Sequence, residues 1–167
     1  VSPGSSDGRW SSSYAGILAD VSATIPIAEK GELFVHAGIS RVIRAMVLMN
    51  LVDYFGDVPY KEAVDPANFN PAVDKGADVY AAALADLNKA IENFNAKSKS
   101  GATGDLYYGG NTDSWIRAAN SLKLKYYLNR RLIDAAGSTS AINALISENK
   151  LISTNAQNLA FKYGTNL

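Results

Sequence analysis

The chain has 167 residues, with 16 basic and 16 acidic side chains, one histidine and no cysteine. Its length is sufficient for one domain with a hydrophobic core, and its 47% hydrophobic and 19% charged residues are typical of a globular protein. The balanced charge gives no general attraction to nucleic acid or to an anionic membrane, and the absence of cysteine excludes disulfides and thiolate metal sites. We therefore expect residues 1–167 to form a single domain.

The first two predicted helices cover about residues 10–30 and 32–55. Both carry apolar side chains at helical intervals along one face. Pro26 is expected to disturb the last turn of the first helix, and Gly56 is a suitable C-terminal stop for the second. The two helices should form an antiparallel hairpin.

An irregular connection is predicted after Gly56, because three prolines lie between residues 56 and 74. Asp53 and Asp57 flank this turn. A pair of carboxylates can serve a glycosidase, but these two are more simply interpreted as turn and helix-end residues.

The third predicted helix, about residues 75–95, has the clearest periodicity. Its apolar face is expected to consist of Tyr80, Leu84, Leu87, Ile91 and Phe94. Its polar side chains are expected to face water, namely Asp86, Lys89, Glu92 and Asn93. We expect the second, third and fourth helices to form the core.

The fourth predicted helix covers about residues 114–136. Thr112 or Asp113 is expected to cap its N-terminus, and Gly137 to stop it. Its apolar residues, Trp115 among them, occupy most of the helix circumference. That distribution is typical of a central helix.

A short fifth helix is predicted at about residues 139–149, capped by Ser138 or Thr139. Beyond it, residues 159–163 alternate weakly between apolar and polar, which favours a short strand or an extended segment. Antiparallel helix pairs without long strands predict an all-α fold of stacked helix pairs, with about five helices.

No motif of a metalloprotease, serine hydrolase or nucleotide-binding loop is present. His36 is the only histidine, and with Glu32 it would make a weak acid–base pair; a packed or surface histidine is the favoured interpretation. Asn111 to Asp113 is interpreted as a helix cap rather than a calcium site. The basic residues between 117 and 131 point in several directions, which argues against nucleic-acid binding. We expect no enzyme, no cofactor and no metal site.

Aromatic residues are abundant, with nine Tyr, five Phe and two Trp. An exposed ring beside amides and hydroxyls can stack on the C–H face of a sugar. Trp10, just before the first helical pattern, is the best candidate for such a platform, and Tyr107 and Tyr108 in a Gly-rich loop come next. The favoured interpretation is nevertheless that Trp10 packs on the first helix pair and that the two tyrosines anchor the loop.

Four segments form a composite pattern. NLVDYFGDVPYKEA (Asn50 to Ala63) follows SRVIRA (Ser40 to Ala45) and precedes YAAALADLNKAIENFN (Tyr80 to Asn95) and GDLYYGGNTDSWIRAANSLKLKYYLNRRL (Gly104 to Leu132). In this order and spacing they resemble the SusD/RagB family, in its branch of SusD-like lipoproteins. The resemblance extends from about Trp10 to the C-terminus.

This resemblance implies tetratricopeptide-like helix pairs, which in the family act mainly as scaffold and as transporter-facing surface. It also implies an outer-membrane lipoprotein, exposed at the cell surface, that captures a nutrient without altering it. The nutrient is usually an oligosaccharide or polysaccharide, and it is delivered to a TonB-dependent transporter.

Members of the family are longer and carry a signal peptide and a lipid-modified cysteine. The chain is therefore expected to be a portion of a longer protein, without its lipid anchor and without a transmembrane segment. Two alternatives remain: a helical-repeat scaffold that binds only another protein and no carbohydrate, and, more remotely, an unrecognised hydrolase.

Overall fold

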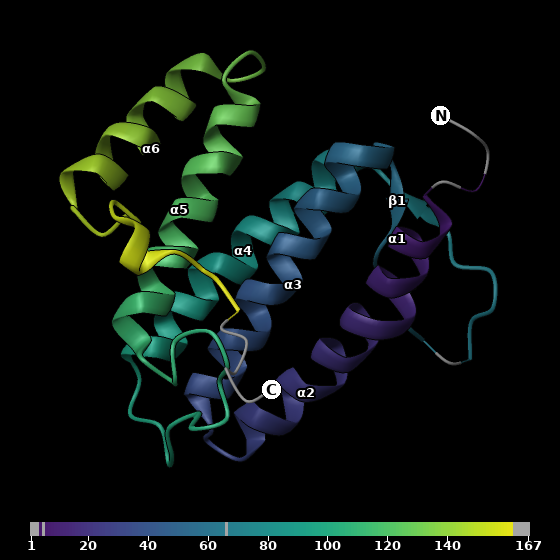
Figure 1. The fold of residues 1–167 in the computed structure, drawn as a ribbon. Helices are drawn as coiled ribbons and strands as arrows, with labels where there is room; N and C mark the ends of the chain where they lie inside the picture. Colours follow the sequence, from purple (N-terminus) through teal and green to yellow (C-terminus); the bar gives the residue numbers. More distant parts are fainter. Residues whose placement is uncertain (1–3, 5, 66, 162–167) are drawn as a thin grey trace, which may run out of the picture.

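The computed structural model describes residues 4, 6–65 and 67–161 as an all-α fold with a very small sheet (Figure 1). Its helices are α1 (Asp7–Ser11), the π-helical η1 (Ser12–Leu18), α2 (Ala19–Lys30), α3 (Phe34–Phe55), α4 (Gly76–Asn95), α5 (Thr112–Arg130), α6 (Ala135–Ser147) and the 3₁₀ turn η2 (Asn155–Gln157). Strands β1 (Val58–Pro59) and β2 (Val73–Asp74) pair antiparallel. The predicted fold class is confirmed.

Successive long helices run in alternating directions, with α3 and α4 in the middle of the array (Figure 1). The first helix, α1 to α2, pairs antiparallel with α3 as predicted. The fully buried large side chains come mainly from α3, α4 and α5, and include Leu48, Leu87, Trp115 and Tyr126. The second to fourth predicted helices thus form the core.

Helix α3 is apolar on most of its circumference, because it has neighbours on both sides. Its 22 residues have a mean hydropathy of 1.3 over the most apolar window, which by length and composition would suffice to cross a membrane. More than half of that window is buried inside the fold. Arg41 and Arg44 also lie within it and pair with α4. We interpret α3 as the core helix of a globular fold.

The interface between α3 and α4 contains a buried ionic cluster. Asp86 of α4 accepts hydrogen bonds from Arg41 Nη1 at 3.0 Å and from Arg44 Nε and Nη2, each at 2.6 Å. Arg41 Nη2 also donates to Glu29 of α2 at 2.7 Å. The Asp86 side chain is only 5% exposed. One carboxylate therefore links α4 to two cations of α3, and a shared arginine extends the cluster to α2.

The prediction that Asp86 and Asn93 face water is wrong, because both side chains are buried against neighbouring helices. They lie seven residues apart, which is two helical turns, so they share one face of α4. The periodicity of the apolar residues predicted the apolar part of the buried face of α4. It did not predict that the polar Asp86 and Asn93 extend that face. Leu87 is fully buried and Leu84 partly buried, as the predicted apolar face requires.

Helix α2 continues through Pro26 to Lys30, contrary to the expected disturbance. Proline has no backbone N–H, so the carbonyl four residues before Pro26 lacks its helical hydrogen bond. Pro26 is exposed, so water can bond to that carbonyl instead. Helix α3 begins at Phe34 rather than near residue 32. Glu32 has a positive φ of 57° and belongs to the turn between the helices.

The boundary between the fourth and fifth helices also differs from the prediction. Helix α5 ends at Arg130, and Gly137 lies inside α6 rather than stopping its predecessor. The caps are Asn111, whose Oδ1 accepts from the N–H of Ser114 at 2.9 Å, and Asp134, whose Oδ1 accepts from the N–H of Gly137 at 3.0 Å. The predicted caps Thr112, Asp113, Ser138 and Thr139 instead lie within the helices, because an earlier side chain already accepts the free N–H of each first turn.

The connection after α3 is irregular as predicted, apart from β1 and β2. Gly56 has φ 77° and ψ −114°, a conformation that only glycine adopts readily. Asp57 accepts from the N–H of Gly76 at 2.8 Å and pairs with Lys75, so it acts as a helix-end residue. At the other end of the chain, residues 159–161 form no strand, and residues 162 and 163 of that predicted segment lie outside the described residues.

Replacing Asp86 with alanine should reduce the free energy of unfolding by about 3–5 kcal/mol, because Arg44 would remain largely buried without a counter-charge and Arg41 would keep only Glu29. Glu92→Ala is the control, since the exposed Lys89–Glu92 pair on the same helix should contribute less than about 1 kcal/mol. Urea unfolding measures both. Equal losses in the two variants would contradict a structural role of the cluster.

Gly56→Val should destabilise the fold by about 1–3 kcal/mol, since a β-branched residue cannot adopt its backbone conformation without strain. A Cβ there would meet no atom within 4 Å, so the effect isolates the backbone. Gly101→Val, where a Cβ also meets nothing and φ is not positive, is the control. Thermal unfolding of the pair tests this, and a stable Gly56→Val variant would refute it.

Candidate functional site

Trp10 lies in α1 and packs against two other aromatic rings. Its ring centroid is 4.7 Å from that of Tyr14 and 5.1 Å from that of Phe55, the second contact being edge-to-face. The side chain is partly exposed and borders a hollow of about 220 Å³. Trp10 thus joins the first helix to the end of α3 and still contributes to a surface concavity.

The same hollow has a fixed polar wall. Tyr14 donates a hydrogen bond from its hydroxyl to the carbonyl of Pro59 at 2.7 Å. Burial, together with the nearby charge of Asp74, raises the pKa of Tyr14 to about 12. The hydroxyl therefore stays protonated at neutral pH, and the remaining walls are apolar or prolyl, including Ala63 and Pro71.

Tyr107 and Tyr108 lie in the loop before α5 and contact Trp115 edge-to-face. Their ring centroids are 6.1 and 5.3 Å from that of Trp115. Tyr108 also donates from its hydroxyl to the carbonyl of Gln157 at 2.8 Å. Both tyrosines are partly buried, so part of each ring is covered by α5 and is not accessible to a ligand.

Asp105 organises this loop, and sequence reasoning did not identify it. Its carboxylate accepts from the N–H groups of Tyr107, Tyr108 and Gly110 at 2.9–3.2 Å and from Trp115 Nε1 at 2.7 Å. Partial burial opposes ionisation, but the hydrogen bonds outweigh it and hold the pKa of Asp105 below its usual value. The only signal in the sequence is an aspartate shortly before two glycines, Gly109 and Gly110, which both adopt positive φ.

The structure does not bring the three predicted platform residues together. Helix α1, with Trp10, and the loop before α5, with Tyr107 and Tyr108, lie at opposite ends of the helical array (Figure 1). A single sugar unit cannot contact both.

A cavity of about 450 Å³ lies between the helices α2 and α3 and the loop that carries Tyr107. His36 lines it, and His36 Nδ1 has no hydrogen-bond partner among the described residues. The acid–base pair with Glu32 is not formed, since the Glu32 carboxylate pairs with Lys99 at 3.3 Å. The favoured interpretation of His36 as a packed or surface residue agrees with this geometry.

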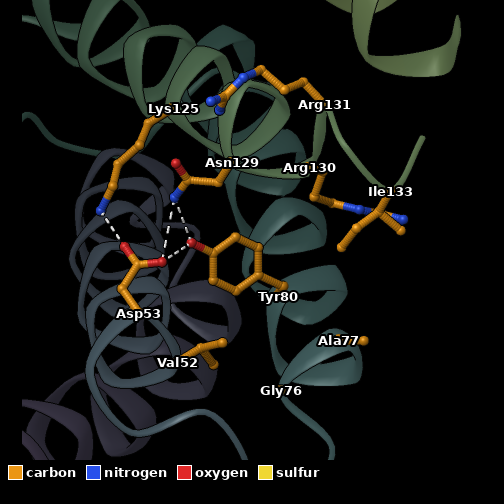
Figure 2. Close-up of a pocket in the computed structure, with 10 residues that line it drawn as sticks. All are labelled: Val52, Asp53, Gly76, Ala77, Tyr80, Lys125, Asn129, Arg130, Arg131 and Ile133. Carbon is orange, nitrogen blue, oxygen red and sulfur yellow. Dashed lines mark hydrogen bonds and ion pairs between the residues drawn. The ribbon is translucent and has the colours of Figure 1, made fainter. Parts of the chain in front are cut away.

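A third cavity, of about 660 Å³ and larger than the two described above, lies where the end of α3, the start of α4 and the end of α5 meet (Figure 2). Asp53 is the centre of its polar wall. Its Oδ2 pairs with Lys125 Nζ at 2.8 Å, and its Oδ1 accepts from the hydroxyl of Tyr80 and from Asn129 Nδ2 at 3.3 Å. Asn129 Nδ2 also lies 2.8 Å from the Tyr80 hydroxyl oxygen.

This polar wall is preorganised, because side chains from three helices fix one another. Burial, and after it the hydrogen bond to Asp53, raises the pKa of Tyr80 to about 12, so its hydroxyl stays a donor at neutral pH. Sequence reasoning placed Asp53 at a helix end and Tyr80 in the core. It missed their meeting with Asn129, because these residues are 27 to 76 positions apart in the chain.

The other walls of the cavity are apolar and cationic. Val52, Ala77 and Ile133 supply apolar surface, and Ile133 is 80% exposed. Arg130 lies over the ring of Tyr126, with 5.4 Å between guanidinium carbon and ring centroid, and Arg131 is exposed at the rim. Such a combination can bind a polar organic ligand by hydrogen bonds and an apolar face together. Among residues 4, 6–65 and 67–161, no group of three acidic or histidine side chains is arranged for a metal ion.

Antiparallel helix pairs packed side by side, with concavities between their ends, define a tetratricopeptide-like helical array. Residues 2–167 match the SusD-like family, described as starch-binding and associating with the outer membrane, and the chain belongs to this family. The resemblance seen in the sequence is thereby confirmed. No curated protein matches the chain.

Solved structures agree with this assignment. A SusD/RagB family protein from Bacteroides thetaiotaomicron superposes with a TM-score of 0.84 at 23% identity, over 99% of this chain and 35% of its own, and shares the fold. A chitin-binding protein gives 0.79 at 27% identity, over 90% and 32%. A SusD homolog from Bacteroides uniformis gives 0.78 at 26%, over 91% and 32%. The chain spans about a third of the length of these proteins.

The lowered pKa of Asp105 predicts how stability depends on pH. Its contribution is fully present above the unfolded-state pKa, about 3.9, and is lost as the pH falls through the lower folded-state value. The difference in unfolding free energy between the wild type and Asp105→Asn should therefore be largest at pH 7 and shrink below about pH 4. Denaturant unfolding at both pH values measures it, with the exposed Asp113→Asn as control. A difference that is constant with pH would refute this role.

Proposed function

We propose that the full-length protein binds a glycan at the outer-membrane surface without altering it chemically. The observation that carries the proposal is the family match over residues 2–167, because this family is described as starch-binding and associating with the outer membrane. The chitin-binding protein among the similar structures supports a saccharide as the class of ligand.

Within this chain, two concavities fit a sugar. In the first, the partly exposed Trp10 and the fixed hydroxyl of Tyr14 combine an aromatic surface with a polar group. The second is the cavity around Asp53 and Asn129, with hydrogen-bonding groups on one wall and apolar side chains on another. Tyr107 and Tyr108 are weaker candidates, since both rings pack against Trp115 and the Tyr108 hydroxyl already donates to the carbonyl of Gln157.

The proposal includes delivery of the glycan to a TonB-dependent transporter, with the helical array as the surface that contacts it. A lipid anchor elsewhere in the full-length protein would hold the array at the membrane surface. Both the transporter and the lipid anchor are inferred from the resemblance to SusD-like lipoproteins.

A protein-binding scaffold without a carbohydrate ligand is the second candidate function. The observation that favours it is the apolar surface around the turn from α5 to α6. There Leu132 is 87% exposed and Ile133 80% exposed. Exposed apolar residues gathered in one region are typical of a contact surface for another protein.

Calorimetry of the full-length protein against a panel of oligosaccharides tests the proposal. We expect dissociation constants between about 1 μM and 1 mM, since stacking and hydroxyl hydrogen bonds on an open surface must offset desolvation and ordering. Trp10→Ala should weaken binding by about tenfold if its ring stacks on the sugar. Phe69→Ala is the control, because Phe69 is 96% exposed and lies outside the hollow.

Unchanged affinity in Trp10→Ala would remove Trp10 from the site and leave the proposed function in place. Absence of glycan binding, together with tight binding of a protein partner, would favour the scaffold. Release of a shortened oligosaccharide during the titration, detected by mass spectrometry, would contradict the non-catalytic part of the proposal.

A further inference from the structure

We infer that the cavity between α3, α4 and α5 binds an acidic sugar unit, one that carries a carboxylate or a sulfate ester, and that Arg131 and Asn129 recognise it. The inference rests on the proposed glycan-binding function and names a substrate class and a site for it. Asp53, Lys125, Asn129 and Arg131 all line this cavity (Figure 2).

The charges that line the cavity do not balance. Lys125, Arg130 and Arg131 are cationic, whereas Asp53 is the one acidic side chain among the lining residues. Asp53 pairs with Lys125. Within the described part of the chain, neither arginine forms an ion pair with a carboxylate. The cavity therefore favours a ligand that carries negative charge.

Of the two arginines, Arg131 is the one that remains available. Arg130 donates to the hydroxyl of Tyr126 and lies over its ring, so its position is fixed by α5 itself. Arg131 donates one N–H from Nη1 to the carbonyl of Leu128 at 2.7 Å, which leaves further donors of its fork free. Figure 2 shows its guanidinium group extending toward the side of the cavity that holds Asn129. A planar fork of this kind binds carboxylate and sulfate oxygens in pairs.

The side-chain oxygen of Asn129, beside the guanidinium group of Arg131, can accept a hydrogen bond from a hydroxyl of the sugar. The Nδ2 of Asn129 already donates hydrogen bonds to Asp53 and to the hydroxyl oxygen of Tyr80. These two bonds fix the orientation of the amide. Its Oδ1 makes no hydrogen bond among the described residues and points away from Asp53 (Figure 2). A hydroxyl on the carbon next to the acidic substituent of a sugar would donate to this oxygen.

The remaining walls suit the body of a sugar ring. Val52, Ala77 and Ile133 provide apolar surface for its C–H face, beside the polar network (Figure 2). A volume of about 660 Å³ lies within the range of roughly 300–1,000 Å³ that small-molecule sites occupy. The carboxylate or sulfate thus meets Arg131, a hydroxyl meets Asn129 and the ring lies on the apolar wall.

The test is calorimetry of the full-length protein with four probes: a trigalacturonate, a sulfated disaccharide, the neutral trisaccharide maltotriose and inorganic sulfate. We expect at least one acidic saccharide to bind about tenfold more tightly than maltotriose at low ionic strength, as one charge-assisted hydrogen-bond pair implies. Preference between the first two probes distinguishes a carboxylate from a sulfate ester. Equal affinity for acidic and neutral saccharides overturns the inference, and inorganic sulfate binding as tightly as either saccharide overturns it too.

Arg131→Gln should abolish the preference for the acidic saccharide, with a loss of about tenfold. Arg131→Lys, which keeps the charge and loses the fork, should recover only part of it. Lys123→Gln is the control, since it removes one charge from the same helix outside the cavity and should change affinity less than about twofold. An acidic saccharide that binds equally well to the wild type and to Arg131→Gln overturns the assignment to this cavity.

Two-dimensional NMR locates the binding site directly, in addition to the measured affinities. The side-chain amide of Asn129 should shift on addition of the acidic saccharide, and less with maltotriose. If glycans bind but these signals do not move, the inferred site is wrong and the proposed function stands. If no saccharide binds the wild-type protein at all, both fail.

Discussion

The pairing of Asp86 with Arg41 and Arg44 fixes how α4 lies against α3, and the rest of the fold depends on it. Because the helices are antiparallel, one fixed contact sets the whole register. On one side of the cluster, Gly38 meets the ring of Phe94, where even a Cβ would lie 2.6 Å from a ring carbon. On the other side, Asp53 meets Tyr80. A buried ion pair contributes little net stability, so its main effect here is to exclude other registers.

That register decides where the polar wall of the large cavity forms. Asp53 belongs to the last turn of α3 and Tyr80 to the second turn of α4, so they meet only if α4 begins beside the end of α3. The Asp57 cap and the close approach of Gly76 to the carbonyl of Gly56 hold this junction. Asn129 and Lys125 then complete the wall from α5. The candidate site is thus built by the packing of helix ends and not by a loop.

Most of the fold could be predicted from the sequence, because helical periodicity reports which side of a helix is apolar. It failed at Asp86 and Asn93, since a helical wheel assigns polar residues to water and carries no information on a partner in another helix. Helix boundaries were predicted less well. Several residues near 111 and 134 have cap-forming side chains, and only the backbone geometry decides which of them accepts the first free N–H.

The candidate site could be predicted only in part. Aromatic composition pointed to Trp10, Tyr107 and Tyr108, but a count of aromatic residues does not say that the two tyrosines lie against Trp115. Asp105 has no distinguishing neighbour in the sequence, although four donors converge on it. Arg131 looked like one of several cations on α5. Arg131 lies at the cavity because α5 ends at Arg130. That helix end was not predicted from the sequence.

The π-helical segment η1 has a consequence for Trp10. A π-helical turn takes in more residues than an α-helical turn, so the side chains before it are rotated about the helix axis relative to those after it. In α2 the buried stripe of Val21, Ile25 and Ala28 faces the helical array. Removing one residue from the serines at 11–13 would restore an α-helical phase and turn Trp10 by about 100°. The ring would then leave Phe55 and point elsewhere, so the local winding of one helix sets the direction of an aromatic platform.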